Sequence, residues 1–155
     1  MARLKLSVSS TMVVVPSDTI DIPDVSTEAF PRSTTELGPP FALVDTSKDF
    51  LSLNIKPGDI VQNHTDKTIA TITVVNASTI LTLSANVAGI GKSYSIYTST
   101  TRDAVFYVGA AGDVEYIDSG GNLNIMKAAP VGWHPVNVKR ILDSNTTATD
   151  ILAGW

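Results

Sequence analysis

The sequence contains no cysteine. This absence excludes a disulfide scaffold and any metal site built on thiolates, and it fits a protein made in a reducing cytoplasm. Histidine is also scarce, because His64 and His134 are the only two. A metal site takes three or four ligands at close spacing, and His134 has no histidine or carboxylate two to four positions away. We therefore expect no metal and no cofactor.

Aromatic residues make up only 6% of the chain, and basic residues are fewer than acidic ones. A formal net charge of −4 disfavours a nucleic-acid partner, which requires a basic patch. The scarcity of aromatics disfavours a polysaccharide-cleaving cleft. The stretch from Gly89 to Ser93 ends like a phosphate-binding loop but lacks its first glycine. These absences predict that the protein is not an enzyme.

No apolar run approaches the length of a membrane span, and the stretch Met1–Val15 has no continuous apolar segment like that of a signal peptide. We therefore expect no membrane association. We also expect the protein to be made in the cytoplasm. The hydrophobic share is nevertheless 43%, with a mean hydropathy of +0.16. This apolar excess is buried internally or shared with neighbouring subunits, and sharing is the interpretation we favour.

Short runs of alternating or β-branched residues, separated by Gly, Asn and Asp, dominate the sequence after residue 102. Such runs predict an antiparallel meander. The predicted strands are Ala104–Val108, Asp113–Ile117, Leu123–Met126 and Val136–Leu142. A large aromatic residue, Trp155, follows Ile151 and Leu152, and we expect it to be buried because ordering a terminus needs compensating contacts.

This region resembles the C-terminal part of the head-spike base protein family of gene transfer agents and tailed phages. The motifs that carry the resemblance are Tyr107-Val108-Gly109, Gly112-Asp113-Val114, Pro130-Val131-Gly132, Pro135-Val136-Asn137-Val138-Lys139-Arg140 and Thr146-Thr147-Ala148-Thr149, together with Val15-Pro16-Ser17-Asp18-Thr19. The sequence departs from the family pattern at Trp133-His134, and it carries an extra module between Asp21 and Thr101. The resemblance implies a virion protein at capsid vertices, where it would be the base of a fibre or spike.

The extra module has its own strand signals between Phe41 and Tyr97. Thr68–Val75 alternates with both faces uncharged, and Lys56-Pro57-Gly58-Asp59 is a turn that leads into a further strand. Thr46–Asp49 resembles a capping box, which predicts a single helical turn from Phe50. Several short strands with tight turns favour a small, nearly closed barrel.

These patterns predict an all-β protein, an antiparallel barrel or sandwich-like domain with a second small barrel-like inserted module and at most one short helix. The expected division is 1–20 with 101–155 as the spike-base-like domain, 21–40 as a proline-rich arm or linker, and 41–100 as the inserted module.

The segment 21–40 contains Pro23, Pro31, Pro39 and Pro40, which disrupt regular strand pairing. It is either an ordinary surface loop or an extended arm that lies on a neighbouring subunit. The arm interpretation rests on apolar side chains along the segment and just after it, namely Phe30, Leu37 and Phe41.

The two tryptophans either pack in the core or anchor a contact between subunits. Trp133 is the better interface candidate because Gly132 and Pro135 flank it, and tryptophan is enriched in binding hot spots. His134 beside it, and Trp155, are further interface candidates.

The first functional hypothesis is a non-enzymatic phage structural protein that forms a symmetric homo-oligomer, a trimer or pentamer, on the virion head. Its partners would be copies of itself, the major capsid protein and a fibre or spike protein. One alternative is a capsid cement, collar or tail component. The other is a carbohydrate- or host-surface-binding β-module, for which Trp133, Tyr94, Tyr97 and Tyr116 would supply the aromatic platform.

Overall fold

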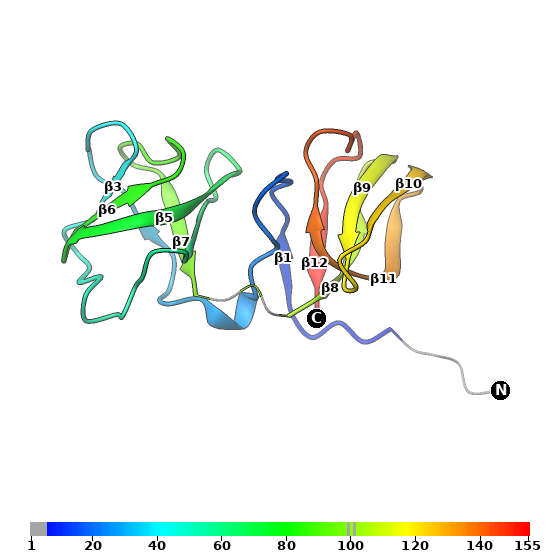
Figure 1. The fold of residues 1–155 in the computed structure, drawn as a ribbon, viewed down its shortest axis with the longest axis horizontal. Coiled ribbons are helices and arrows are strands. Elements are labelled where there is room, and N and C mark those ends of the chain that lie inside the picture. The colour runs from blue at the N-terminus through cyan, green and yellow to red at the C-terminus, as the bar shows by residue number, and fades with distance from the viewer. Residues whose placement is uncertain (1–5, 99, 101) are drawn as a thin grey trace. The chain divides into compact units, whose positions relative to one another are not determined.

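A computed structural model describes residues 6–98, 100 and 102–155 of the chain. The first five residues of the stretch Met1–Val15, in which no signal peptide is expected, lie outside the described part. The chain divides into two compact units. The terminal unit comprises Met1–Val25 with Thr100–Trp155, and the inserted unit comprises Ser26–Ser99 (Figure 1).

The terminal unit is a six-stranded antiparallel sheet in the order β1-β12-β8-β11-β9-β10. Its strands are β1 (Thr11–Val13), β8 (Ala104–Val108), β9 (Gly112–Asp118), β10 (Leu123–Ala129), β11 (Gly132–Ile141) and β12 (Leu152–Gly154). Each predicted meander strand is present. The sheet is not a simple meander, because β11 inserts between β8 and β9, and β12 brings the end of the chain beside β1.

The inserted unit is a second six-stranded sheet, in the order β2-β7-β4-β5-β6-β3. Its strands are β2 (Ser33–Thr34), β3 (Ala42–Val44), β4 (Ile60–Asn63), β5 (Thr68–Ala77), β6 (Ile80–Leu83) and β7 (Ser93–Tyr97). The long strand β5 pairs with β4 along its first half and with β6 along its second half. Two register shifts in the second half turn Val74 out to solvent while Val75 packs against the core.

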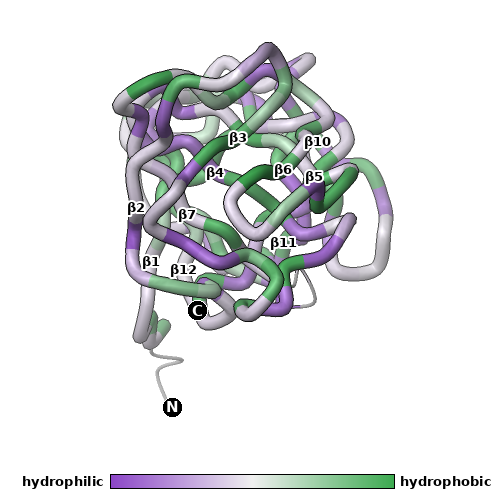
Figure 2. The backbone as a smooth tube through the Cα atoms, turned by 90° about the vertical axis from the view of Figure 1, so that its left-hand side faces the viewer, coloured by the Kyte–Doolittle hydropathy of each residue, from purple (hydrophilic) through white to green (hydrophobic). Residues whose placement is uncertain are grey.

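The edges of this second sheet are joined, which gives the unit its barrel character. Beyond β2, the amide of Glu36 donates to the carbonyl oxygen of Val44 in β3 at 2.7 Å. The Ser33 hydroxyl in β2 donates to Asp45, just after β3, at 2.6 Å. The enclosed core contains Phe30, Phe50, Tyr94 and a set of aliphatic side chains, and the stretches near β3 and β6 are strongly apolar in Figure 2.

The predicted single helical turn at Phe50 is present as one hydrogen-bonded turn, and it does not extend into a helix. The amide of Leu53 donates to the Asp49 carbonyl oxygen at 3.1 Å. The cap is Asp49 itself, whose carboxylate accepts hydrogen bonds from the amides of Leu51 and Ser52, so the side chain of Thr46 is not the cap. One short 3₁₀ helix, η1 (Val25–Thr27), lies elsewhere in the described chain, where no helix was predicted.

The proline-rich segment is not a separate arm. Residues 26–40 belong to the inserted unit, and residues 21–25 belong to the terminal unit. From residue 27 to 35 the chain runs antiparallel to β7, with Ala29 donating to Ile96 O at 2.8 Å and Thr35 donating to Lys92 O at 2.8 Å. Pro31, the one proline between residues 27 and 35, lies between these bonding positions, so the segment serves as an interrupted edge strand.

Both units are all-β, and every pair of strands is antiparallel, which confirms the predicted fold class. The inserted unit is the smaller barrel-like module of that prediction. Its first residue is Ser26 and not residue 41, because Phe30 fills its core.

Candidate interaction surface

The strand register of the terminal unit places one row of apolar side chains across four strands. Residues that are direct partners in neighbouring strands share a face of the sheet. The register pairs Val13 with Leu152, Leu152 with Tyr107, and Tyr107 with Trp133. We call these four side chains the outer row. With strands about 4.8 Å apart, the row spans about 14 Å.

The row next to it points in the opposite direction, into the core. It consists of Met12, Ala153, Phe106 and His134, which are likewise register partners. Phe106 and Ala153 are fully buried. The outer row therefore faces away from the core, and Val13 and Trp133 remain 42% and 37% exposed.

Two contacts hold Trp133 in place within the outer row. Its indole meets the ring of Tyr107 edge-on, with the ring centroids 5.5 Å apart. The indole also covers Gly154 of β12, where a Cβ atom would come within 2.8 Å of Cη2 of Trp133 and 2.7 Å of Cγ1 of Val8. A glycine at this position therefore lets the indole lie close to the backbone of the sheet.

The edge strand β10 adds a second apolar feature to the terminal unit. It pairs only with β9 among the described strands, and Leu123 and Ile125 on it are exposed. Edge strands are commonly protected by charge. The one lysine of β10, Lys127, is held by Asp113 of β9 in an ion pair of 2.7 Å.

The structure separates the six predicted interface candidates. Leu37 is 76% exposed, and Phe41 is exposed in the inserted unit with a φ of 64°. Phe30 is not an interface residue within this fold, because it lies 8% exposed in the core and meets the ring of Tyr94 edge-on at 5.9 Å.

His134 and Trp155 are each engaged within the terminal unit. The His134 ring stacks on Phe106 at 5.0 Å, on the core face of the sheet. Trp155 is half-buried, and its indole N–H donates to the carbonyl oxygen of Arg102 at 3.1 Å. Trp133 is therefore the one of these three candidates that belongs to the outer row.

Motifs behind the family resemblance have structural roles in the terminal unit. The Asp18 carboxylate accepts the Ser144 hydroxyl, and it accepts the amides of Asp143 and Ser144 at 2.9 and 3.0 Å. The Ser144 hydroxyl and then these amides lower the pKa of Asp18. Gly112 lies against the backbone of Ala148, and the Thr147 hydroxyl accepts the amide of Asp113 at 2.8 Å. These motifs fasten the N-terminal segment and the Thr-rich segment to the sheet.

A histidine, a serine and a glutamate form a chain in the inserted unit. Ser95 donates its hydroxyl proton to Glu28, since a carboxylate only accepts, and His64 Nε2 lies 3.0 Å from the same hydroxyl oxygen. His64 must then donate to Ser95. This order is unlike a catalytic triad, in which histidine accepts the proton of the nucleophile. Ser95 is also fully buried, so the chain positions Glu28 and does not activate a nucleophile.

Burial lowers the pKa of His64, and the nearby charge of Arg32 lowers it further, while Glu28 opposes both effects. The neutral imidazole is therefore favoured. Among the described residues no group of three His, Cys, Asp or Glu side chains is placed to hold a metal ion. No helix in this described part is long and apolar enough to cross a membrane.

Sequence reasoning had selected Trp133 but missed the other members of the outer row. Tyr107 alternates with Phe106 in β8, so its outward direction was readable once Phe106 was assigned to the core. Val13 and Leu152 had no comparable signal, because their place in the row depends on pairing between the two ends of the chain.

Comparisons with known proteins returned no match to a family model, to a curated protein or to a solved structure.

Proposed function

We propose that this chain is a non-enzymatic structural subunit of a tailed phage or a phage-like particle. It forms a symmetric homo-oligomer on the head, as the base of a vertex spike or as a head decoration. The proposal that the chain belongs to such a particle is supported by the resemblance of Asp103–Trp155 and Val15–Thr19 to the head-spike base proteins. The partners are then copies of this chain, the major capsid protein and a fibre or spike protein.

The proposed self-association is supported mainly by the outer row. Its members lie on the solvent side of the sheet, and its indole is held in a fixed orientation by Tyr107 and Gly154. A fixed, half-exposed tryptophan within an apolar surface is the usual centre of a protein interface. The row alone is smaller than the roughly 800 Å² that each partner contributes to a standard interface, so it would be the centre of a larger contact.

The function in this account is adhesion, and it requires no chemical step. In a ring with closed symmetry one modest interface is repeated around the axis, and several subunits then hold the particle at once. The exposed edge of β10 offers a second route for contact between copies, because its backbone groups on one side have no strand partner among the described residues.

A carbohydrate- or host-surface-binding module is the second candidate, favoured by the exposed indole of Trp133. The geometry gives it less support, because Tyr107 meets the indole edge-on and the pair does not form a flat platform. A capsid cement, collar or tail component would use the outer row in the same way as a spike base, at another place on the particle.

The oligomeric state of the full chain, measured by native mass spectrometry and light scattering, tests self-association. We expect a trimer or pentamer for the wild type and dissociation for Trp133→Ala and Val13→Lys. Trp133→Ala could disturb the fold if the indole is needed for packing. Val13→Lys changes an exposed residue of an edge strand, so it tests the outer row without that risk. Ile90→Ala, which alters an exposed apolar side chain of the inserted unit, is the matched control.

A monomeric wild type at about 100 μM, a concentration far above a typical Kd for stable oligomers, would contradict the proposal. So would an oligomer that is unchanged by both outer-row variants. Intact assembly with loss of glycan binding in Trp133→Ala would favour the carbohydrate-binding module.

A further inference from the structure

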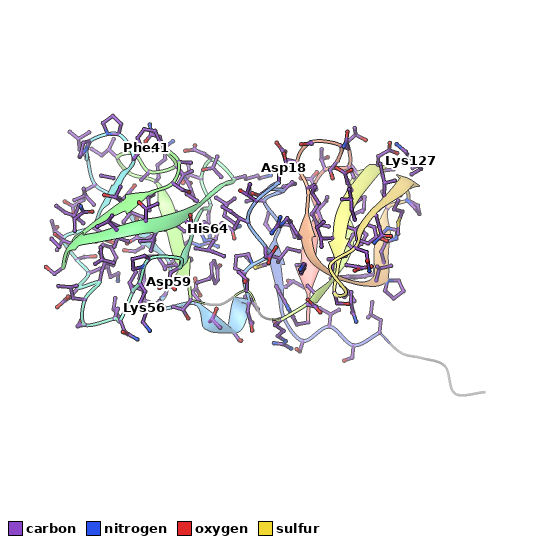
Figure 3. The ribbon with its side chains drawn as sticks, viewed as in Figure 1. Asp18, Phe41, Lys56, Asp59, His64 and Lys127 are labelled. Atoms are coloured by element: carbon purple, nitrogen blue, oxygen red, sulfur yellow. The ribbon has the colours of Figure 1, made fainter. Side chains whose placement is uncertain are left out.

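A cavity of about 520 Å³ lies in the inserted unit, and none of its lining residues belongs to the terminal unit that carries the outer row. Its walls are η1 and the residues after it, the turn segment between Leu53 and Asp59, and the residue after β7. The volume is within the range of about 300–1,000 Å³ that is typical of small-molecule sites. Figure 3 labels Lys56 and Asp59, which both line the cavity, and His64 in the same unit.

Asp59 is the buried carboxylate of this cavity, with only 8% of its surface exposed. Its Oδ2 accepts the amide of Lys56 at 2.8 Å. An ionised carboxylate offers about four acceptor positions. Burial raises the pKa of Asp59 and outweighs the Lys56 amide and charge, which lower it, so a cation bound beside this carboxylate would stabilise its ionised form.

Glu28 supplies a second carboxylate, and its orientation is fixed. It accepts the Ser95 hydroxyl, and Ser95 is held in turn by His64. Ser95 is fully buried, and its hydroxyl holds one carboxylate oxygen of Glu28. The Glu28 side chain is otherwise exposed and lines the cavity. A ligand that binds Glu28 therefore does not have to order a freely rotating carboxylate.

The remaining lining defines what the cavity can accept. Lys56 contributes one positive charge, which leaves a net charge of −1 on the lining, and it forms no ion pair with either carboxylate within the described structure. Leu53 and Ala29 provide an apolar wall. None of the described residues that line the cavity is aromatic, so they do not form the stacking platform of a typical sugar site.

We propose that this cavity binds an alkylammonium group, with the carboxylates of Asp59 and Glu28 accepting its N–H bonds and with Leu53 and Ala29 contacting its alkyl chain. The source is either a free amine or a lysine side chain of a partner protein. Two carboxylates satisfy a three-donor ammonium better than they satisfy a metal ion, which needs more ligands than this cavity provides.

A ¹H–¹⁵N NMR titration of the full chain tests the site. The probes are n-butylammonium, its neutral counterpart n-butanol, and the lysine mimic Nα-acetyl-lysine-N-methylamide. We expect saturable shifts of cavity amides such as Leu53 and Asn54 with both amines, at a Kd of about 1–10 mM, and none with butanol. A lower Kd for the lysine mimic assigns the site to a protein partner, and a lower Kd for butylammonium assigns it to a free amine.

Variants then connect binding to the two carboxylates. Asp59→Asn and Glu28→Gln should each weaken amine binding about tenfold, the effect of losing one hydrogen bond to a charged group. Asp66→Asn is the matched control, because Asp66 pairs with Lys92 outside the cavity of the same unit. If Asp59→Asn does not fold, the exposed Glu28→Gln decides alone. Equal shifts with butanol, no saturable shift with either amine, or an unchanged Kd in Glu28→Gln would overturn the proposal.

Discussion

Replacing Asp45 by asparagine tests how the inserted unit is held closed. Asp45 follows β3 and is only 1% exposed. It accepts the Ser33 hydroxyl from β2 at 2.6 Å and the Tyr94 hydroxyl from β7 at 2.8 Å. It also accepts the amide and hydroxyl of Ser47, at 2.9 and 2.5 Å. One carboxylate thus connects both ends of the curled sheet.

The size of the expected loss of stability depends on which hydrogen bonds of Asp45 an asparagine can still make. Its carbonyl oxygen can still accept both bonds from Ser47, but as a neutral acceptor. Its NH₂ group would face the hydroxyls of Ser33 and Tyr94, which both donate to Asp45 in the native protein. Hydrogen bonds to a charged group contribute about 1.5–3 kcal/mol, and neutral ones about 0.5–1.5 kcal/mol. We therefore expect Asp45→Asn to lower the free energy of unfolding of the inserted unit by about 2–4 kcal/mol.

The same contacts make the stability of this unit depend on pH. Burial alone would raise the pKa of Asp45, but the hydrogen bonds from Ser33, Ser47 and Tyr94 outweigh burial and hold the pKa below its ordinary value. A carboxyl group with a depressed folded-state pKa stabilises the fold above its unfolded-state pKa. That contribution is lost as the pH falls below about 4 and through the folded-state pKa. In Asp45→Asn this part of the pH dependence should be absent.

Amide hydrogen exchange of β4 and β7 between pH 3 and 7, with correction for intrinsic exchange rates, measures the free energy of opening of this unit. Both tryptophans lie in the terminal unit, so the fluorescence of Trp133 and Trp155 follows that unit separately. A loss below about 0.5 kcal/mol, the usual size of surface effects, would refute the closing role of Asp45. An unchanged acid dependence in the variant would refute the electrostatic part of the reasoning.

Three further substitutions test the packing described above by urea denaturation. Gly112→Ala should destabilise the terminal unit by more than about 2 kcal/mol, because the added Cβ would lie 2.5 Å from a backbone nitrogen. Gly89→Ala is the control. Its Cβ would meet only a lysine side chain at 3.9 Å, so the substitution should have little effect on stability. Phe30→Ala removes a core side chain and should lower the free energy of unfolding of the inserted unit by about 3–5 kcal/mol. A loss below about 0.5 kcal/mol, the usual size for a surface residue, would instead favour the arm interpretation of the segment 21–40. Arg140→Lys should destabilise the terminal unit by about 1 kcal/mol, because lysine cannot reproduce the contact of two guanidinium nitrogens with Asp21 at 2.6 and 2.7 Å. The loss should be smaller in high salt, and a loss that does not depend on salt would contradict this reasoning.

Local sequence patterns predicted the strands well. Ala104–Val108 has the bounds that were predicted from its β-branched and aromatic composition, and β9 differs by one residue at each end. Glycine-rich clusters at Gly109 and Gly112 marked the turn between them. These signals are local, since they depend on side-chain alternation and on residues that tolerate tight turns.

Some of the predictions that failed depended on contacts between distant segments, and one failed for a local reason. Prolines in 21–40 suggested either a surface loop or an arm, but part of the segment pairs with β7, about sixty residues later, and Phe30 enters the core. The predicted cap at Thr46 failed because Asp49, three residues later, caps its own turn. No local pattern could have shown that Asp59 lies in a cavity with Glu28, since different parts of the chain supply them.

Immunogold labelling of purified particles, viewed by electron microscopy, tests the central proposal most directly. The antibody should be raised against the folded chain and shown to bind it in native form. Gold confined to the head vertices is the predicted result, and gold spread over the head or at the neck or tail would move the subunit to a cement, collar or tail role. Particles without any gold would contradict the proposal that this chain is a structural subunit of the virion.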